Sequence, residues 1–510
     1  MNEEAKPHKR FRVVSSKLRS GSLDVVMLGP GDASMLGVLP GERVQLICAH
    51  CGCGAALLVS KDVEPGTVVV SEGIYEKIRI TGCDSVHVVP LGVPASLGFL
   101  LRRLRGEKLG PKEVKAIIAD IVQGYYDDAG IAAFLSAQAM RGMDEEELEY
   151  LIRAMVETGT VVEFGEPVFD EHSIGGVPGN SKVALLAVPT VASTGLLIPK
   201  TSSRAITSPA GTADTMEVLA RVAFSPDELR DIAKKVRGVL AWGGSLNLAP
   251  ADDIFVRVER KLGIDPPVQL VASILAKKLA MSVSTLVLDI PMGKGAKVET
   301  EAEAEKLASM FLQQAGRLGI KLRIAITYGG EPIGFTVGPA LEAREALETL
   351  MKGDGSPSLV TKACSIAGLL LEMGGVSGPG KGFDKACEIL RSGKAYQKFR
   401  EMLEAQEGDP DIKPEDIEIG KYSYTLEALN EGTVTHIDNH AITMAARAAG
   451  APQDKRAGIQ LHVKVGYRVS RGDPLLTVYA SNKTKLKEAL QVLAAYSPVA
   501  VEGMLIKILP

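Results

Sequence analysis

Two glycine- and hydroxyl-rich loops, residues 169–180 and 200–214, constrain the fold more than any other feature of the chain. Each is followed by an apolar stretch that predicts a helix, 183–191 after the first loop and 216–220 after the second. A loop that leads into a helix presents free backbone N–H groups, and the helix dipole adds partial positive charge. Hydroxyl groups supply neutral donors, and glycine lets the backbone approach an anion closely. Two such loops in one domain predict a site for one or two phosphate groups.

Short apolar strands alternate with helical stretches between about residues 159 and 430. We expect strands at 286–290 and 322–326, and also at 185–188, although that segment lies inside the stretch that favours a helix. This alternation predicts a sheet with helices on its faces. Because ligands of such open sheets bind beyond the carboxyl ends of the strands, both loops are expected there.

The remaining parts of the chain have other patterns, β-like near residues 12–93, helical after residue 96, and β-like again at the end. Residues 32–44 resemble the pattern of small double-psi β-barrels and bring no obvious catalytic constellation. We therefore expect a multidomain α/β chain with an N-terminal β-barrel-like assembly domain (1–93), a small helical domain (94–158 plus about 253–281), a large α/β phosphate-binding domain with a central sheet (159–252 plus 282–430) and a C-terminal α+β domain (431–510).

Charge and hydropathy exclude several classes of protein. The net charge of −4 gives no reason to expect binding to nucleic acid. No apolar run is long enough to span a membrane, and the charged segment 1–12 lacks the apolar core of a signal peptide. We expect a cytoplasmic protein without a membrane partner.

Three cysteines, Cys48, Cys51 and Cys53, cluster around His50 and leave two interpretations. They are either zinc ligands or packed thiols. Zinc modules usually show two paired knuckles, and this single uneven cluster favours packed thiols. We expect no metal and no cofactor. Cys364 and Cys387 are expected to be buried in helices.

The second loop carries a specific resemblance. Residues 202–217 read Ser-Ser-Arg-Ala-Ile-Thr-Ser-Pro-Ala-Gly-Thr-Ala-Asp-Thr-Met-Glu, similar to the signature of the thymidine and pyrimidine-nucleoside phosphorylases. Residues 172–177 resemble the first phosphate loop of that family, and 249–252 and 272–278 are further matches. The resemblance extends from about residue 97 to the C-terminus.

Departures from that pattern point to one branch of the family. Glu171 stands where thymidine phosphorylases usually have Lys, and 203–209 replace a Gly-Arg-Gly-Leu-Gly-His-Thr run. The base-contacting Arg of the family falls near Val258, and a segment of roughly ninety residues is added at the N-terminus. Together these features resemble the archaeal AMP phosphorylases over the whole chain.

This resemblance implies phosphorolysis of AMP, with CMP and UMP as further candidate substrates, by inorganic phosphate. The products would be the free base and ribose 1,5-bisphosphate. Alternatives are a pyrimidine-nucleoside (thymidine) phosphorylase, an anthranilate phosphoribosyltransferase and a non-enzymatic scaffold. The phosphoribosyltransferase would need acidic Mg²⁺ ligands, whereas these loops offer hydroxyls. An intact hydroxyl loop argues against the scaffold.

The hydroxyl groups of the second loop are the candidates for cradling phosphate: Ser202, Ser203, Thr207, Ser208 and Thr212. Alternatively they cap a helix or fill turns. The resemblance places Ser202, Thr212 and Ser173 at phosphate-contacting positions. Arg204 suits a fork-like phosphate contact or an internal pair with Asp214 or Glu217. His172 would contact the base, help move a proton, or hold the loop.

The leaving base needs an acid, and the resemblance assigns this role to Asp265, which otherwise would cap the next helix. In relatives that helix contacts the base through the positions of Ser273 and Lys277. Lys294 and Lys297 follow a predicted strand and are candidates for a contact with the 5′-phosphate or with the base. The full expected substrate-binding set is Gly176, Val177, Ser202, Ser203, Arg204, Ala205, Ile206, Thr207, Ser208, Thr212, Ser273, Lys277, Lys297, His172 and Ser173.

Relatives with nucleoside activity lack the N-terminal module and are dimers. We therefore expect a homodimer that the module joins into a larger homo-oligomer.

Overall fold

The computed structural model describes residues 10–16, 24–48, 51–80, 82–205 and 207–503. The chain forms two compact units. One comprises Met1–Gly159 with Ala249–Ala276, and the other comprises Thr160–Leu248 with Lys277–Pro510.

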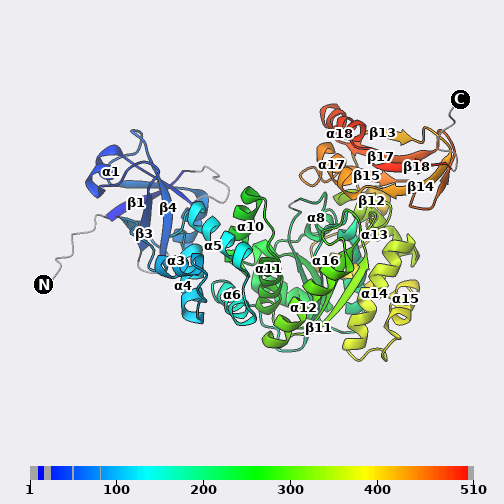
Figure 1. Cartoon of the computed structure of the whole chain (residues 1–510), viewed down its shortest axis with the longest axis horizontal. Coiled ribbons are helices and arrows are strands. Elements are labelled where there is room, and N and C mark those ends of the chain that lie inside the picture. The colour runs from blue at the N-terminus through cyan, green and yellow to red at the C-terminus, as the bar shows by residue number, and fades with distance from the viewer. Residues whose placement is uncertain (1–9, 17–23, 49–50, 81, 206, 504–510) are drawn as a thin grey trace. The chain divides into compact units, whose positions relative to one another are not determined.

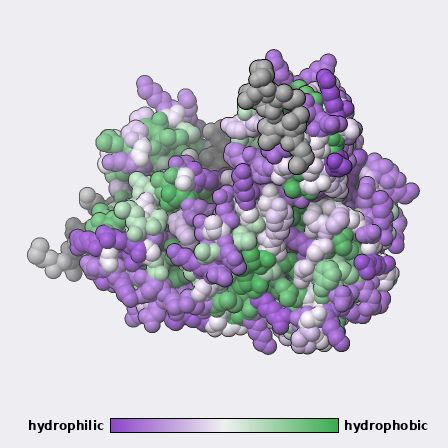
Figure 2. All heavy atoms as spheres, turned by 45° about the vertical axis from the view of Figure 1, so that its right-hand side comes forward, coloured by the Kyte–Doolittle hydropathy of each residue, from purple (hydrophilic) through white to green (hydrophobic). Residues whose placement is uncertain are grey.

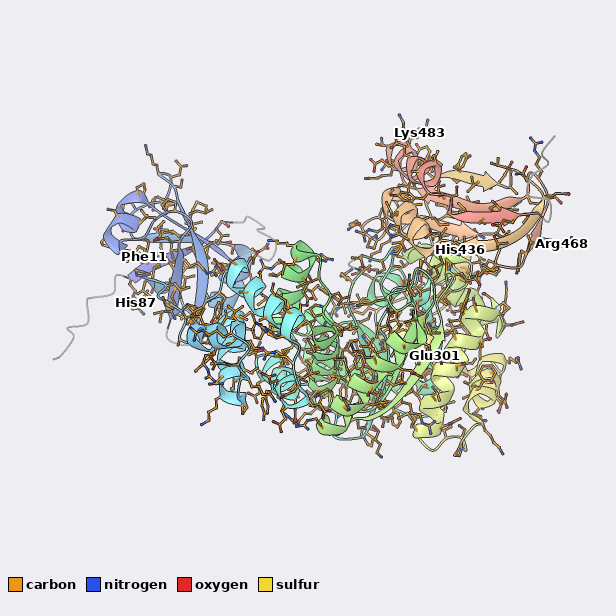
Figure 3. All side chains as sticks on the ribbon, in the orientation of Figure 1. Phe11, His87, Glu301, His436, Arg468 and Lys483 are labelled. Carbon is orange, nitrogen blue, oxygen red and sulfur yellow. The ribbon has the colours of Figure 1, made fainter. Side chains whose placement is uncertain are left out.

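The first unit begins with a β-barrel, drawn in blue in Figure 1. The barrel is closed, and its strand order is β1-β5-β2-β4-β3-β6. Its elements are β1 (Arg10–Ser15), β2 (Val25–Leu28), α1 (Pro30–Leu36), β3 (Arg43–Cys48), β4 (Cys51–Val59), β5 (Thr67–Val70), α2 (Glu72–Ile80) and β6 (Ser85–Pro90). The pairs β1–β5 and β2–β4 are parallel, and β1 closes the barrel against β6 in antiparallel register. Phe11, labelled in Figure 3, is fully buried in the barrel core.

Helices form the rest of this unit: α3 (Leu97–Leu104), α4 (Pro111–Val122), α5 (Asp128–Arg141), α6 (Glu145–Glu157), α10 (Pro250–Leu262) and the first part of α11 (Pro267–Ala280). Asp144 caps α6 by accepting hydrogen bonds from the backbone N–H groups of Glu146 and Glu147. The later segment joins the earlier helices through α10, where the Phe255 ring lies 5.9 Å from the Phe134 ring of α5.

The second unit contains a parallel sheet in the order β11-β10-β7, which a parallel bridge between Val168 and Leu197 extends to the pair β8-β9. The strands are β7 (Val168–Ser173), β8 (Ile198–Ser202), β9 (Gly238–Trp242), β10 (Val283–Met292) and β11 (Lys321–Tyr328). The helices are α7 (Val183–Ala192), α8 (Thr212–Met216), α9 (Pro226–Val236), α12 (Glu301–Leu318), α13 (Pro339–Lys352), α14 (Pro357–Met373), α15 (Gly382–Arg391) and α16 (Lys394–Ala405).

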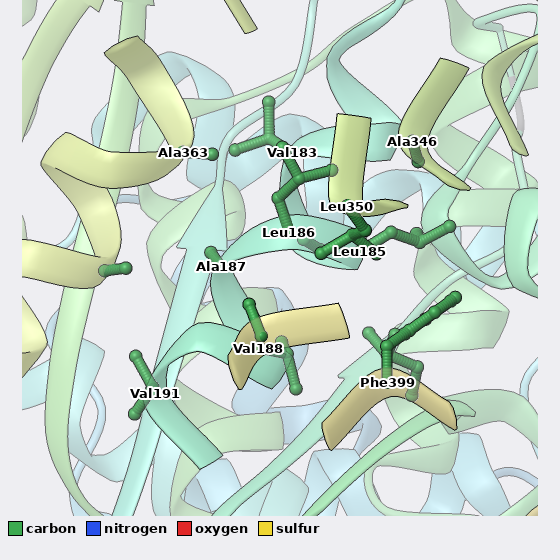
Figure 4. Packing of buried hydrophobic residues seen from close by; sticks show 14 of the residues in the cluster. Val183, Leu185, Leu186, Ala187, Val188, Val191, Ala346, Leu350, Ala363 and Phe399 are labelled. Atoms are coloured by element: carbon green, nitrogen blue, oxygen red, sulfur yellow. The ribbon is translucent and has the colours of Figure 1, made fainter. Parts of the chain in front are cut away.

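Helix α7 lies at the centre of the core, and each of its residues is buried. Figure 4 shows its apolar side chains beside Ala346 and Leu350 of α13, Ala363 of α14 and Phe399 of α16. The predicted strand at 185–188 is therefore wrong. A helix that is apolar all round is a buried helix, and its short apolar runs resemble buried strands.

The C-terminal part has two antiparallel sheets, ordered β12-β15-β17-β13 and β16-β14-β18, with two helices. Its elements are β12 (Thr336–Val337), β13 (Tyr422–Glu427), β14 (Gly432–Ile437), α17 (Asn439–Ala449), β15 (Gly458–Leu461), β16 (Arg468–Val469), β17 (Pro474–Ala480), α18 (Lys483–Ala495) and β18 (Val499–Glu502). Strand β12 comes from the α/β part, so the C-terminal sheet continues into it. The predicted multidomain fold class is confirmed.

The face of the protein in Figure 2 is mostly hydrophilic, with apolar residues gathered in patches. Among the described residues, no helix is long and apolar enough to cross a membrane.

Candidate active site

Three loops meet at the carboxyl edge of the parallel sheet. They follow Ser173 at the end of β7, Ser202 at the end of β8 and Met292 at the end of β10. The first and third loops touch, because a Cβ added at Gly176 would lie 2.7 Å from both the Cβ and the backbone nitrogen of Lys297. Residues far apart in the sequence therefore converge at the edge where ligands of such sheets bind.

The first loop is shaped by Ser173 and two glycines. The Ser173 hydroxyl accepts hydrogen bonds from the Gly175 N–H at 3.3 Å and from the Asn180 side-chain amide at 2.9 Å. Gly175 and Gly176 have φ angles of 78° and 91°, in the region that favours glycine. The other amide atom of Asn180, Oδ1, is buried and has no hydrogen-bond partner among the described residues. Asn180 was not among the predicted residues.

The second loop is folded around Asp214. This carboxylate accepts hydrogen bonds from the backbone N–H groups of Ala205 at 2.6 Å and Gly211 at 3.1 Å. The loop then enters α8, which begins at Thr212 and ends at Met216. The predicted helix at 216–220 is wrong, since the helix starts earlier, at Thr212, where the Asp214 carboxylate accepts a hydrogen bond from the N–H group of the N-cap residue Gly211.

Hydroxyl groups of this loop already make internal hydrogen bonds. Ser202 donates to the Ser203 carbonyl at 3.1 Å, Ser208 to the Ala210 carbonyl at 3.2 Å, and Thr212 to the Ser181 carbonyl at 3.3 Å. Each hydroxyl would have to rotate its O–H group away from these carbonyls to donate to a phosphate. The hydrogen bond from Thr212 to Ser181 also connects the second loop to the segment just before α7. Ile206 lies outside the described residues.

Arg204 makes the internal pair, one of the two interpretations that the sequence left open. Its guanidinium donates two hydrogen bonds of 2.5 Å to the carboxylate of Glu217, and it lies 4.7 Å from the centre of the Trp242 ring. Lys455 of the C-terminal part also pairs with Glu217. Hydrogen bonding by Arg204, followed by Lys455, lowers the pKa of Glu217 to about 2.

The C-terminal part also holds the second loop directly. Arg447 donates a hydrogen bond of 3.2 Å to the carbonyl of Ser208. Neither Arg447 nor Lys455 was among the predicted residues. No local pattern could reveal them, because their partners lie more than two hundred positions earlier in the sequence.

A buried charge network lies beneath the first loop. Lys278 pairs with Asp170 at 2.6 Å, while Lys200 is 3.3 Å from Glu171 and 3.7 Å from Asp170. All four side chains are buried, and the two cations balance the two carboxylates. Burial lowers the pKa of Lys278 to about 8, although Asp170 opposes this shift. Glu171, the residue that departs from the thymidine phosphorylase pattern, is therefore neutralised by Lys200.

His172 lies at the end of β7 beside this network. Burial lowers the pKa of its imidazole well below the usual value, and the nearby charges of Lys278, Lys200, Lys277 and Lys297 lower it further. The ring is therefore neutral near pH 7, with one donor and one acceptor nitrogen. Its Nδ1 atom is buried and has no hydrogen-bond partner among the described residues. A neutral ring of this kind suits a hydrogen bond to an uncharged base.

The remaining predicted residues divide between the two units. Lys297 is exposed on the loop after β10, and Lys277 is half-buried near the end of α11. Val177 is buried in the first loop, whereas Ser203 and Thr207 are exposed in the second. Asp265, exposed just before α11, and Ser273, one turn before Lys277, belong to the other unit.

The described part of the chain contains no group of three or more His, Cys, Asp or Glu side chains that could hold a metal ion. In the barrel, Cys48 is half-buried and Cys53 is buried, and His50 lies outside the described residues.

Three segments match known protein families. Residues 98–159 match the glycosyl transferase family helical bundle domain, residues 165–396 the a/b domain of that family, and residues 433–500 the pyrimidine nucleoside phosphorylase C-terminal domain. The fold is also similar to a solved structure of anthranilate phosphoribosyltransferase from Thermus thermophilus, with a TM-score of 0.52 at 21% identity over 61% of this chain and 99% of that one. The fold and the matched domains define a glycosyltransferase of the pentosyltransferase class.

Full-length relatives define the family more closely. The chain is 64% identical to the AMP phosphorylase of Hyperthermus butylicus over 99% of this chain and all of that protein. It is 48% identical to the AMP phosphorylase of Pyrococcus furiosus over 98% of this chain and 99% of that protein. The chain belongs to the AMP phosphorylase family, which confirms the resemblance carried by the two loops.

Proposed function

We propose that the chain catalyses the phosphorolysis of AMP, which gives adenine and ribose 1,5-bisphosphate. The observation that carries the proposal is the 64% identity, over nearly the whole length of both chains, to a relative named AMP phosphorylase. The loops at the carboxyl edge of the sheet support it, since they combine backbone donors, hydroxyl groups and lysines in the region where such sheets bind phosphates.

In this reaction an oxygen of inorganic phosphate forms a bond to C1′ of the ribose as the bond from C1′ to the base nitrogen breaks. The electron pair of the broken bond goes to the base, which must take up a proton. The enzyme therefore has to hold the phosphate, place it on the face opposite the base, and deliver the proton. No covalent intermediate with the protein is needed.

We assign inorganic phosphate to the hydroxyl cradle of Ser173, Ser202 and Thr212. These residues lie at the ends of β7 and β8 and at the start of α8, where backbone N–H groups and hydroxyls are concentrated. We assign the 5′-phosphate of AMP to Lys297. Its exposed side chain starts from a backbone that packs on Gly176, and an ammonium group supplies a charge that neutral hydroxyls lack.

We assign the base to His172, Ser273 and Lys277, and the proton donor to Asp265. The neutral imidazole of His172 supports a contact with an uncharged ring. Asp265 directly precedes the helix that carries Ser273 and Lys277, and a carboxyl group that holds a proton can pass it to the leaving nitrogen. The remaining loop residues, Gly176, Val177, Ser203, Arg204, Ala205, Ile206, Thr207 and Ser208, complete the proposed substrate-binding set.

A panel of substrates tests the proposal. Purified protein is incubated with AMP, CMP, UMP, adenosine or thymidine, with and without phosphate, and the released base is measured. The proposal requires phosphate-dependent release of adenine from AMP. The second candidate, a pyrimidine-nucleoside phosphorylase, is favoured by the match of residues 433–500 and would cleave thymidine far better than AMP.

We also propose that the N-terminal barrel joins dimers of the chain into a larger particle. The barrel has a hydrophobic core of its own and supplies none of the proposed substrate-binding residues.

A further inference from the structure

Helices α14 and α15 approach each other unusually closely through two glycines. A Cβ added at Gly368 of α14 would lie 2.5 Å from the carbonyl carbon of Gly382 at the start of α15, and one added at Gly382 would meet the Gly368 carbonyl. Such a backbone contact allows side chains that face each other nearby to touch across a short gap.

Cys364 and Cys387 occupy facing positions in this helix pair. Cys364 lies one turn before Gly368 on α14, and Cys387 lies a little over one turn after Gly382 on α15. Both are free thiols, with exposed fractions of only 2% and 6%. Burial, together with the neighbouring Cys387 thiol, raises the pKa of the Cys364 thiol. The two sulfur groups are therefore neighbours on helices whose backbones are in contact.

One of the two thiols borders an open cavity. Cys387 lines a cavity of about 490 Å³ together with Phe383, Asp384, Glu388, Arg391 and Ser392. Cys364 is not among the residues that line it. A small reagent in this cavity would therefore meet the sulfur of Cys387 before that of Cys364.

We propose that Cys364 and Cys387 are a redox pair that closes into a disulfide bond between α14 and α15. The oxidant is a small-molecule disulfide. The thiolate of Cys387 attacks one sulfur of the reagent, which expels one small thiol and leaves a mixed disulfide on Cys387. Cys364, as its thiolate, then attacks the Cys387 sulfur and expels the second small thiol. The two protons released by the cysteines end on the two leaving thiols, so the protein loses two hydrogen atoms and the reagent gains them.

The disulfide closes a loop that contains the second half of α14 and the first half of α15. It therefore restricts the unfolded chain and strengthens a helix pair whose buried apolar residues belong to the main core. Lys362, one half-turn from Cys364, pairs at 2.9 Å with the buried Asp289 of β10. The locked helix pair is thus attached to the strand that leads into the Lys297 loop.

Peptide mapping tests the pair in the full-length native protein. The protein is treated with hydroxyethyl disulfide, freed of reagent, denatured with iodoacetamide present and digested with trypsin without reduction. We expect the tryptic peptides 363–381 and 386–391 to be joined, and to separate on reduction. Recovery of both peptides in alkylated form, or of either one joined to another cysteine peptide, would overturn the proposal.

Two variants test the order of the steps. In the Cys364→Ser variant, half of the reagent should remain on Cys387 as a mixed disulfide. In the Cys387→Ser variant, Cys364 should stay unmodified as long as the protein is native. Equal modification of Cys364 in the second variant would contradict the assigned order. Oxidation should raise the unfolding midpoint of the wild-type protein by roughly 5 °C and leave that of Cys364→Ser unchanged. An equal rise in both proteins would refute the role of the cross-link.

Discussion

Replacing Gly176 with alanine adds a methyl group where the loop after β7 touches the loop after β10. The new carbon would lie 2.7 Å from the Cβ and from the backbone nitrogen of Lys297. Non-bonded carbon atoms prefer about 3.5–4.0 Å, so the loops must move apart by about 1 Å. The φ angle of 91° adds a conformational cost of about 1–2 kcal/mol for any residue with a Cβ atom.

Gly175→Ala is a matched control for this change. Gly175 lies in the same loop with a φ angle of 78°, so alanine there carries a similar conformational cost. A Cβ at Gly175, however, meets nothing within 4 Å. The difference between the two variants therefore isolates the contact between the loops.

We expect both variants to lose stability, Gly176→Ala more than Gly175→Ala because the clash with Lys297 adds to the conformational cost that they share, and we expect the two variants to differ strongly in activity. Since displacing a positioned group by about 1 Å can cost about a hundredfold in rate, kcat/KM for AMP should fall about a hundredfold in Gly176→Ala and less than about tenfold in Gly175→Ala. Steady-state kinetics at saturating phosphate and thermal unfolding measure the two effects. Equal losses of kcat/KM in the two variants would show that the approach of the loops has no part in binding AMP.

Three further predictions concern acid catalysis, the two phosphate groups and assembly. Asp265→Asn should lower kcat by about a hundred- to ten-thousandfold with little change in the affinity for AMP. If the variant kept the kcat of the wild-type protein, Asp265 would not be the proton donor. Lys297→Ala should raise KM for AMP more than KM for phosphate, and Thr212→Ala should raise KM for phosphate more than KM for AMP. If Lys297→Ala instead raised mainly KM for phosphate and Thr212→Ala mainly KM for AMP, the 5′-phosphate site and the inorganic phosphate site would have been assigned the wrong way round. Deletion of residues 1–86 should give a smaller particle in light scattering that is still a folded dimer, and an unchanged mass would refute the assembly role.

Elements with a clear apolar pattern were predictable from the sequence. The runs 286–290 and 322–326 lie inside β10 and β11, and β10 is apolar because a strand within a parallel sheet is buried on both faces. The run 185–188 is equally apolar but belongs to helix α7, in which every residue is buried. Burial on all faces removes the polar stripe that normally distinguishes a helix from a strand.

The candidate site was predictable where its features are local in the chain. The loops follow directly after strands, so glycine spacing and hydroxyl content identify them. Contacts across the sheet and between domains were not predictable. The ion pair between Glu171 and Lys200 depends on which strands are neighbours in the sheet. The hydrogen bond from Arg447 to Ser208 and the ion pair of Lys455 with Glu217 depend on how the C-terminal part packs. Single-sequence patterns carry no information on such pairs.

The most direct test of the account follows the oxygen atoms of phosphate. The protein is incubated with AMP and ¹⁸O-labelled inorganic phosphate, and the sugar product is analysed by mass spectrometry. The account predicts ribose 1,5-bisphosphate with the labelled phosphate on C1 and the unlabelled phosphate on C5, formed in step with adenine. Ribose 5-phosphate that carries no labelled phosphate group would contradict the account. A protein that makes no product from AMP, but makes labelled ribose 1-phosphate when adenosine replaces AMP, would contradict it as well.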